Sequence, residues 1–164
     1  MEETYYPLFS EIFERVHKAK TKEQKVGILQ QYKSDALKMF CKAAFDPKIQ
    51  WVFPEGVVPY TPNDAPAGTD HTLLIQETKK LWRFIKGADN ITKQAQKENM
   101  FFQMLEGLHE SEAKLLINAK DKKLHQIYKG LSANVVREAF GWNEDFKVDE
   151  YPQSGRSASG LVDG

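Results

Sequence analysis

The chain has 164 residues, of which 41% are hydrophobic and 28% charged, the balance of a water-soluble globular protein with room for one domain. Its 23 Lys and Arg residues equal its 23 Asp and Glu residues, so the overall charge favours neither an acidic nor a basic partner. Apolar runs fall far short of the ~20 residues of a membrane span, and the single cysteine excludes an internal disulfide. The acidic start lacks the apolar core of a secretion signal, so a cytoplasmic protein is expected.

Apolar residues at helical spacing predict three helices in the first 46 residues. The first covers residues 9–19, where apolar side chains recur every three or four positions. Thr21 and Gln24, three residues apart, form a capping box for the second helix. Ser34 can cap the third helix, which must end before Pro47.

The segment 46–70 interrupts this helical pattern. It contains five of the seven prolines, including those of the Pro54–Pro66 stretch. It also carries large apolar side chains, which a free linker normally lacks. We therefore expect a long ordered crossover against the core, with a mobile tip over residues 61–68.

Five further helices are expected after this crossover, with glycines closing three of them. They cover residues 70–86, 92–108, 111–120, 122–129 and 133–140. The predicted fold is therefore all-α, with about seven or eight helices and a long Pro-rich crossover loop in one compact domain over residues 1–146. The small, polar residues 147–164 are predicted to form a disordered tail.

The usual catalytic and metal-binding patterns are absent from the sequence. The four histidines are isolated from one another, and no phosphate-binding or dinucleotide-binding glycine loop is present. Cys41 lies on an apolar helix stripe, which favours burial over nucleophilicity. We predict no metal, no cofactor and no catalytic activity, since an enzyme here would need an unmarked polar cleft.

Charge is segregated along the chain although the total is zero. Residues 15–42 carry eight bases against two acids, and residues 108–143 carry six bases against four acids. Lysines beside helix beginnings favour contact with regularly spaced phosphates, although they also commonly solvate outer helix faces. The predicted DNA contacts are Lys20, Lys22, Lys25, Lys120, Lys122, Lys123, Gly130, Ser132, Asn134 and Arg137.

Three stretches resemble parts of a known domain. The run TKEQK at 21–25, followed by YKSD at 32–35, resembles the start of the all-helical N-terminal DNA-binding domain of ATP-dependent DNA ligases, especially those of large tailed phages. The run IQWVFP at 49–54 takes the place of that domain's aromatic, Pro-containing stretch. The run GLSANVV at 130–136 is similar to its Gly-containing turn and the helix that touches the DNA backbone. The resemblance covers residues 8–142 and implies duplex-DNA contact through phosphates.

The chain departs from the ligases at the catalytic motif. Leu161 stands where the Lys-x-Asp-Gly lysine would take the AMP, so we expect no nucleotidyltransferase domain and no covalent AMP transfer. The near-neutral charge and the longer Pro-rich stretch are further differences. The chain as a whole is also similar to small phage-encoded proteins of unassigned function from relatives of the T-even phages.

Two functions are therefore predicted. The first is a stand-alone, non-catalytic module that grips duplex DNA by its backbone, provided that the two lysine-rich turns converge without being neutralised. About five phosphate contacts would give a log–log salt slope near −4. The second is a protein-interaction adaptor or inhibitor that docks on replication, transcription or defence machinery. It would use aromatic side chains outside the helix stripes (Trp51, Phe53 and Tyr60), which could equally plug the ends of the core.

Overall fold

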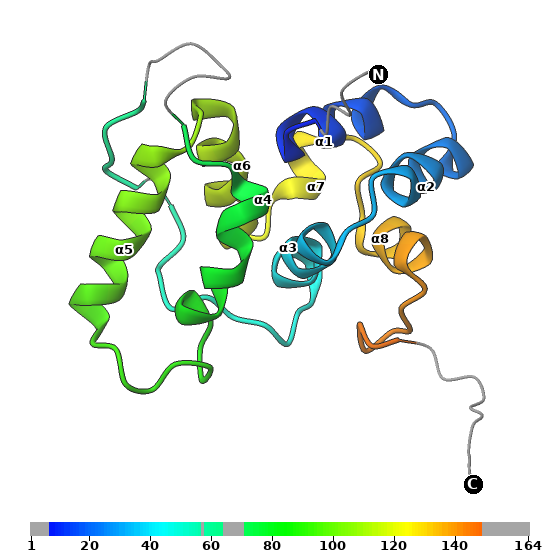
Figure 1. Ribbon diagram of the computed structural model, residues 1–164. Helices are drawn as coiled ribbons and strands as arrows, with labels where there is room; N and C mark the ends of the chain where they lie inside the picture. Colours follow the sequence, from blue (N-terminus) through cyan, green and yellow to red (C-terminus); the bar gives the residue numbers. More distant parts are fainter. Residues whose placement is uncertain (1–6, 57, 64–70, 149–164) are drawn as a thin grey trace, which may run out of the picture.

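The computed structural model describes residues 7–56, 58–63 and 71–148, and in these ranges it is helical, with isolated bridges but no strand (Figure 1). The prediction of an all-α single domain is confirmed. None of the described helices has the length and apolar character needed to cross a bilayer. The helices are α1 (Phe9–Lys18), α2 (Lys22–Gln31), α3 (Asp35–Phe45), α4 (Leu74–Glu77), the 3₁₀ helix η1 (Thr78–Phe84), α5 (Gln94–Gly107), α6 (Glu110–Lys120), α7 (Leu124–Ile127) and α8 (Ala133–Phe140).

Side-chain caps start the helices where the sequence predicts them. The Thr21 hydroxyl accepts from the Gln24 amide at 3.1 Å, and the Gln24 side-chain oxygen accepts from the Thr21 amide at 3.3 Å. Ser34 and Ser132 each accept from the amide three residues on, at 3.0 and 3.3 Å. Gly141 follows α8 with φ +70°, a left-handed conformation that glycine adopts without strain.

The predicted helix over residues 70–86 differs from the structure. A single α-helical turn, α4, passes directly into η1, and the hydroxyl of Thr78 donates to the backbone carbonyl of Ile75 at 3.1 Å. Thr78, Leu81 and Phe84 are buried at a spacing of three, the period of a 3₁₀ helix. An α-helical period would have placed Trp82 with the inward side chains, but the tighter winding leaves it exposed.

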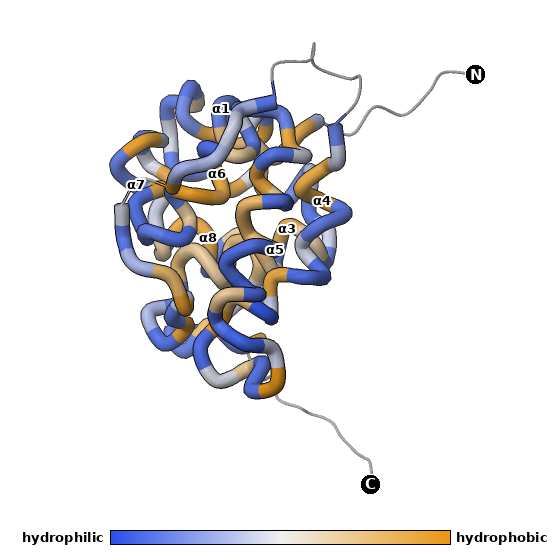
Figure 2. The backbone as a smooth tube through the Cα atoms, turned by 90° about the vertical axis from the view of Figure 1, so that its left-hand side faces the viewer, coloured by the Kyte–Doolittle hydropathy of each residue, from blue (hydrophilic) through white to orange (hydrophobic). Residues whose placement is uncertain are grey.

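The core is built around α3, which packs against α4, η1, α6 and α8. Figure 1 shows α3 between α5 at one end of the molecule and α2 with α8 at the other. The Phe40 ring lies 5.6 Å from that of Phe9 and 6.0 Å from that of Phe13, which joins α3 to α1. Figure 2 shows hydrophilic and hydrophobic residues alternating along the helices, as amphipathic helices require. Cys41 is fully buried, and desolvation raises the pKa of its thiol.

The described part of the crossover is ordered against the core, as predicted. Val52 donates its amide to the Phe84 carbonyl at 2.8 Å, and Lys86 donates to the Gln50 carbonyl at 2.7 Å. Of the predicted mobile tip over residues 61–68, positions 64–68 lie outside the described residues. Of the predicted tail, residues 149–164 lie outside them as well, whereas Lys147 accepts at its carbonyl from the Asn143 amide at 2.8 Å. Backbone hydrogen bonding therefore continues past residue 146, the predicted boundary between the domain and the tail.

Candidate functional site

The turn before α2 and the turn at Gly130 lie side by side. The ammonium of Lys25 donates to the carbonyls of Val16 at 2.8 Å, Ala19 at 2.6 Å and Lys129 at 3.3 Å. A Cβ on Gly130 would lie 2.3 Å from Lys25 Cε, and Gly130 has φ +78°, so a side chain here would strain the backbone and displace the Lys25 ammonium. The two predicted basic turns therefore converge, but Lys25 uses its donors on the end of α1 instead of facing solvent.

The other predicted residues beside these turns differ in how free their charges are. Lys22 pairs with Glu138 at 3.0 Å. The Arg137 side chain donates to Asn134, and its guanidinium lies over the Phe146 ring. Lys20 is exposed, and within the described residues its ammonium has no carboxylate partner.

The lysines at the end of α6 hold the crossover segment in place. Lys120 is 1% exposed at its side chain and donates to Asp121 Oδ1 at 2.6 Å and to the Pro54 carbonyl at 2.7 Å. The Lys123 ammonium pairs with Glu55. Lys120 and Lys123, both predicted to contact DNA, therefore link the end of α6 and the turn after it to residues 54–56.

Lys122 caps the end of α3. Its ammonium donates to the carbonyls of Ala43 at 3.0 Å and Asp46 at 2.8 Å, and its backbone has φ +59°, which ends α6 and shortens the predicted helix 122–129. Burial lowers the pKa of Lys122 to about 8, and the charge of Asp46 opposes that shift. The carbonyls at a helix end attract a cation, which explains why a lysine occupies this place.

An open cleft of about 630 Å³ lies between α3, the crossover and the start of α8. Its apolar wall includes Phe45 and Trp51, and its polar side includes Lys122, His125 and Ser132. Residues predicted to contact DNA, such as Lys122 and Ser132, and Trp51, predicted to contact a protein partner, therefore line the same cleft. Among the described residues, no group of three or more His, Cys, Asp or Glu side chains is placed to hold a metal ion.

The aromatic residues predicted to meet a protein partner lie mainly in the core. Trp51 is 7% exposed and donates its indole N–H to the Ala43 carbonyl at 3.0 Å. The Phe53 ring stacks on that of Phe101, with centroids 4.7 Å apart, while Tyr60 is half-buried. Trp51 and Phe53 thus plug the core, because the extended segment directs its alternate side chains inward.

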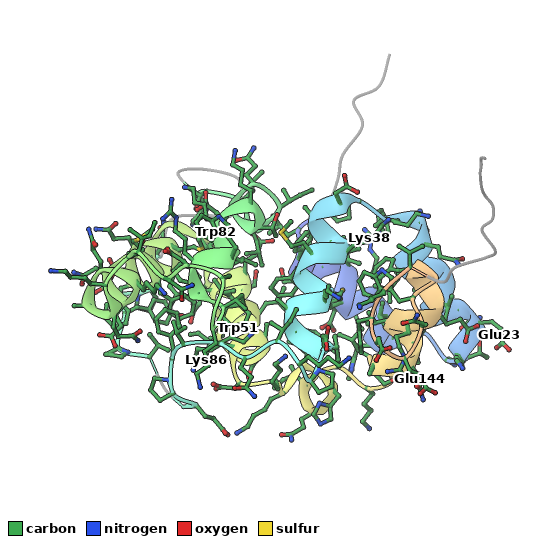
Figure 3. All side chains as sticks on the ribbon, turned by 90° about the horizontal axis from the view of Figure 1, so that it is seen from below. Glu23, Lys38, Trp51, Trp82, Lys86 and Glu144 are labelled. Atoms are coloured by element: carbon green, nitrogen blue, oxygen red, sulfur yellow. The ribbon has the colours of Figure 1, made fainter. Side chains whose placement is uncertain are left out.

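A basic segment that the sequence predictions missed contains Trp82 on η1. Residues 78–97 carry six bases against one acid. Trp82 is 44% exposed, and the Arg83 guanidinium carbon lies 4.6 Å from the centroid of its ring. Figure 3 shows Trp82 and Lys86 in the half of the molecule away from Glu23 and Glu144, with Trp82 toward the upper and Lys86 toward the lower edge of the view. We use the name Trp82 surface for a set of solvent-accessible side chains of this segment, namely Lys79, Trp82, Arg83, Lys86, Ile91 and Lys93.

Three lysines of the Trp82 surface carry unneutralised charge. Lys79, Lys86 and Lys93 are exposed, and no carboxylate pairs with them in the described parts of the chain. Lys80, by contrast, pairs with Glu77 at 3.3 Å. In a protein of zero net charge, such a local excess of cations sets the sign of the local potential.

The loop that carries part of this surface is held rigidly by Asp89. Its buried carboxylate accepts from the amides of Ile91 at 3.0 Å and Thr92 at 3.1 Å, and from Arg83 at 3.4 Å. Hydrogen bonds from Thr92 and Ile91 lower the pKa of Asp89 to about 2. The buried Lys97 ammonium donates to the Asp89 carbonyl at 2.6 Å, and Ile91 projects from the loop with 93% exposure.

The available signal for the Trp82 surface was the charge count, since the run from 78 to 97 has a net charge of +5. It was missed because the predicted α-helical period assigned Trp82 to an apolar stripe. The 3₁₀ winding of η1 instead leaves Trp82 exposed.

Comparison with known proteins places the chain in a family. A family model matches residues 12–126, from α1 into α7. The chain belongs to DUF6433, a family of unknown function. The match includes the Trp82 surface and the Lys120–Lys123 group, whereas Gly130, Ser132, Asn134 and Arg137 lie beyond it.

No curated protein and no solved structure matches the chain. The family description does not mention DNA or ligases, so the resemblance to the ligase domain stays a prediction.

Proposed function

We propose that this protein is a non-catalytic module that binds nucleic acid through its phosphodiester backbone, with the Trp82 surface as the contact. The observation that carries the proposal is an exposed tryptophan in the basic segment 78–97, which also carries three exposed lysines without carboxylate partners. A cytoplasmic setting, the host cytoplasm for a phage-encoded protein, belongs to the same proposal.

The state of the lysines predicted from the sequence to contact DNA supports this choice of surface. Lys25, Lys120 and Lys122 donate to backbone carbonyls, and Lys22 and Lys123 are paired with glutamates. Phosphate binding gains free energy when cations without protein partners displace the counterions of the nucleic acid. Lys79, Lys86 and Lys93 meet that condition. Lys20 is also unpaired among the described residues, but it lies three residues from Glu23, at the end of the molecule away from Trp82.

The test is a triple change of Lys79, Lys86 and Lys93 to Gln. Binding of fluorescein-labelled DNA, followed by anisotropy at several salt concentrations, is expected to weaken about tenfold or more at low salt. Three fewer phosphate contacts should flatten the log–log salt slope by about 2 to 3.

A matched control removes three lysines that already have carboxylate partners. Changing Lys22, Lys114 and Lys123 to Gln removes the same charge from paired positions, so binding should change little. Equal losses in the two triple variants would show that total charge governs binding, and the Trp82 surface would not be the site.

A protein-interaction adaptor is the second candidate, and the cleft beside Phe45 and Trp51 favours it. The substitution Ala133→Arg would place a long side chain at this cleft. An adaptor should capture its partner from a lysate equally well with and without nuclease, and the Ala133→Arg variant should lose it. Capture that disappears with nuclease would count against this candidate.

A further inference from the structure

Resting on the proposed function, we infer that the Trp82 surface selects single-stranded over duplex nucleic acid, because Trp82 is placed to stack on an unpaired base. The inference names the class of ligand that the surface takes. It rests on the exposure of the indole and on the contacts that hold its surroundings in place.

The indole of Trp82 is both accessible and oriented. The Arg83 guanidinium lies over the ring, and 44% of the residue stays open to solvent. Arg83 is itself held by Asp89 Oδ2 and the Thr92 hydroxyl, each at 3.4 Å. A flat aromatic surface with a cation over it is thus present before any ligand arrives, which reduces the ordering cost of binding.

The neighbouring charges fit a strand whose bases are free. Lys79 precedes Trp82 by three residues on η1, so a 3₁₀ winding puts both on one side of that helix, and Lys86 lies two residues past the end of η1. A duplex offers phosphates to these lysines but keeps its base faces stacked inside. A single strand offers phosphates and base faces together, and aromatic stacking on them is largely independent of sequence.

The test compares three probes bound by the full chain. They are an oligothymidine and an oligouridine of about 15 nucleotides, within the size range of such sites, and a DNA duplex of the same length. Wild type should bind the single strands more tightly than the duplex. Comparing oligothymidine with oligouridine shows whether the ligand is DNA, RNA or both.

Substitution at Trp82 isolates the stacking contribution. Trp82→Leu should weaken single-strand binding about tenfold and leave duplex binding within about twofold. Trp82→Tyr, which keeps an aromatic ring, should restore most of the loss. Ile127→Ala is the matched control, because Ile127 is 48% exposed on α7 and lies outside the Trp82 surface.

Tryptophan fluorescence gives a second readout, which nucleic acid would not change if Trp82 had only a structural role. Trp51 is buried, and Trp142 is half-buried with its ring beside those of Phe140 and Phe146, so base stacking should quench emission chiefly from Trp82. This quenching should be absent in Trp82→Leu. Equal binding of duplex and single strand by wild type, or equal losses on both in Trp82→Leu, would overturn the inference.

Different results would contradict the proposed nucleic-acid binding and the inferred preference for single strands. If the triple lysine variant binds every probe as wild type does, the proposed function itself is wrong. If that variant loses binding while Trp82→Leu binds and quenches like wild type, backbone binding stands and stacking is wrong. Dependence on Trp82 for capture of a protein, with none of the three probes bound, would overturn both.

Discussion

Replacing Glu112 with Ala is expected to lower the free energy of unfolding by about 3 kcal/mol, because two buried backbone amides would lose their acceptor. Glu112 is 1% exposed, and its carboxylate accepts from the Phe9 amide and from the Leu74 amide, each at 3.0 Å. One side chain of α6 thereby fixes the starts of both α1 and α4. Urea unfolding followed by circular dichroism measures the change.

Glu110→Ala is the matched control for this experiment. Glu110 lies on the same helix but is exposed and pairs with Lys114 four residues on, at 3.2 Å. Pairs of this kind contribute about 0.5 kcal/mol or less. Similar losses in the two variants would contradict the role assigned to Glu112.

The loss of unfolding free energy in Glu112→Ala should also depend on pH. Burial raises the pKa of the Glu112 carboxyl, and the amides of Leu74 and Phe9 act in the opposite direction with less effect. The folded chain therefore keeps this proton at pH values where the unfolded chain has lost it, so the stabilisation by Glu112 falls as pH rises through that window. We expect Glu112→Ala to lower the free energy of unfolding by more at pH 4.5 than at pH 7.

Lys120→Met is expected to destabilise the fold by about 3 kcal/mol, although the sequence pattern places Lys120 among DNA contacts. Its ammonium and the Asp121 carboxylate form a buried pair, and Asp121 Oδ1 also accepts a hydrogen bond from the Gly56 amide at 3.2 Å. Removing one partner leaves a buried charge uncompensated, and that is the costly change in such pairs. Thermal and urea unfolding both measure it.

Lys123→Met is the control for Lys120→Met. Lys123 lies three residues away and its ion pair with Glu55 is well exposed, so its loss should change stability by less than about 1 kcal/mol. Folded Lys120→Met protein should bind nucleic acid as wild type does. A stable Lys120→Met variant that fails to bind would restore Lys120 to the contact surface.

Much of the fold follows from local sequence. The capping box at Thr21 and Gln24, the caps at Ser34 and Ser132 and the stop at Gly141 each depend on groups within a few residues of one another. Such contacts are encoded by spacing alone, so these helix beginnings and ends are predictable.

The candidate site required the tertiary structure. Lys122 meets Ala43 across 79 residues and Asp46 across 76, so nothing near this lysine in the chain shows that its charge is used inside the protein. Trp82 became a surface residue because η1 winds with three residues per turn. Charge counts and periodicity report what a segment contains, whereas packing between distant segments decides which cations and rings remain open to a ligand.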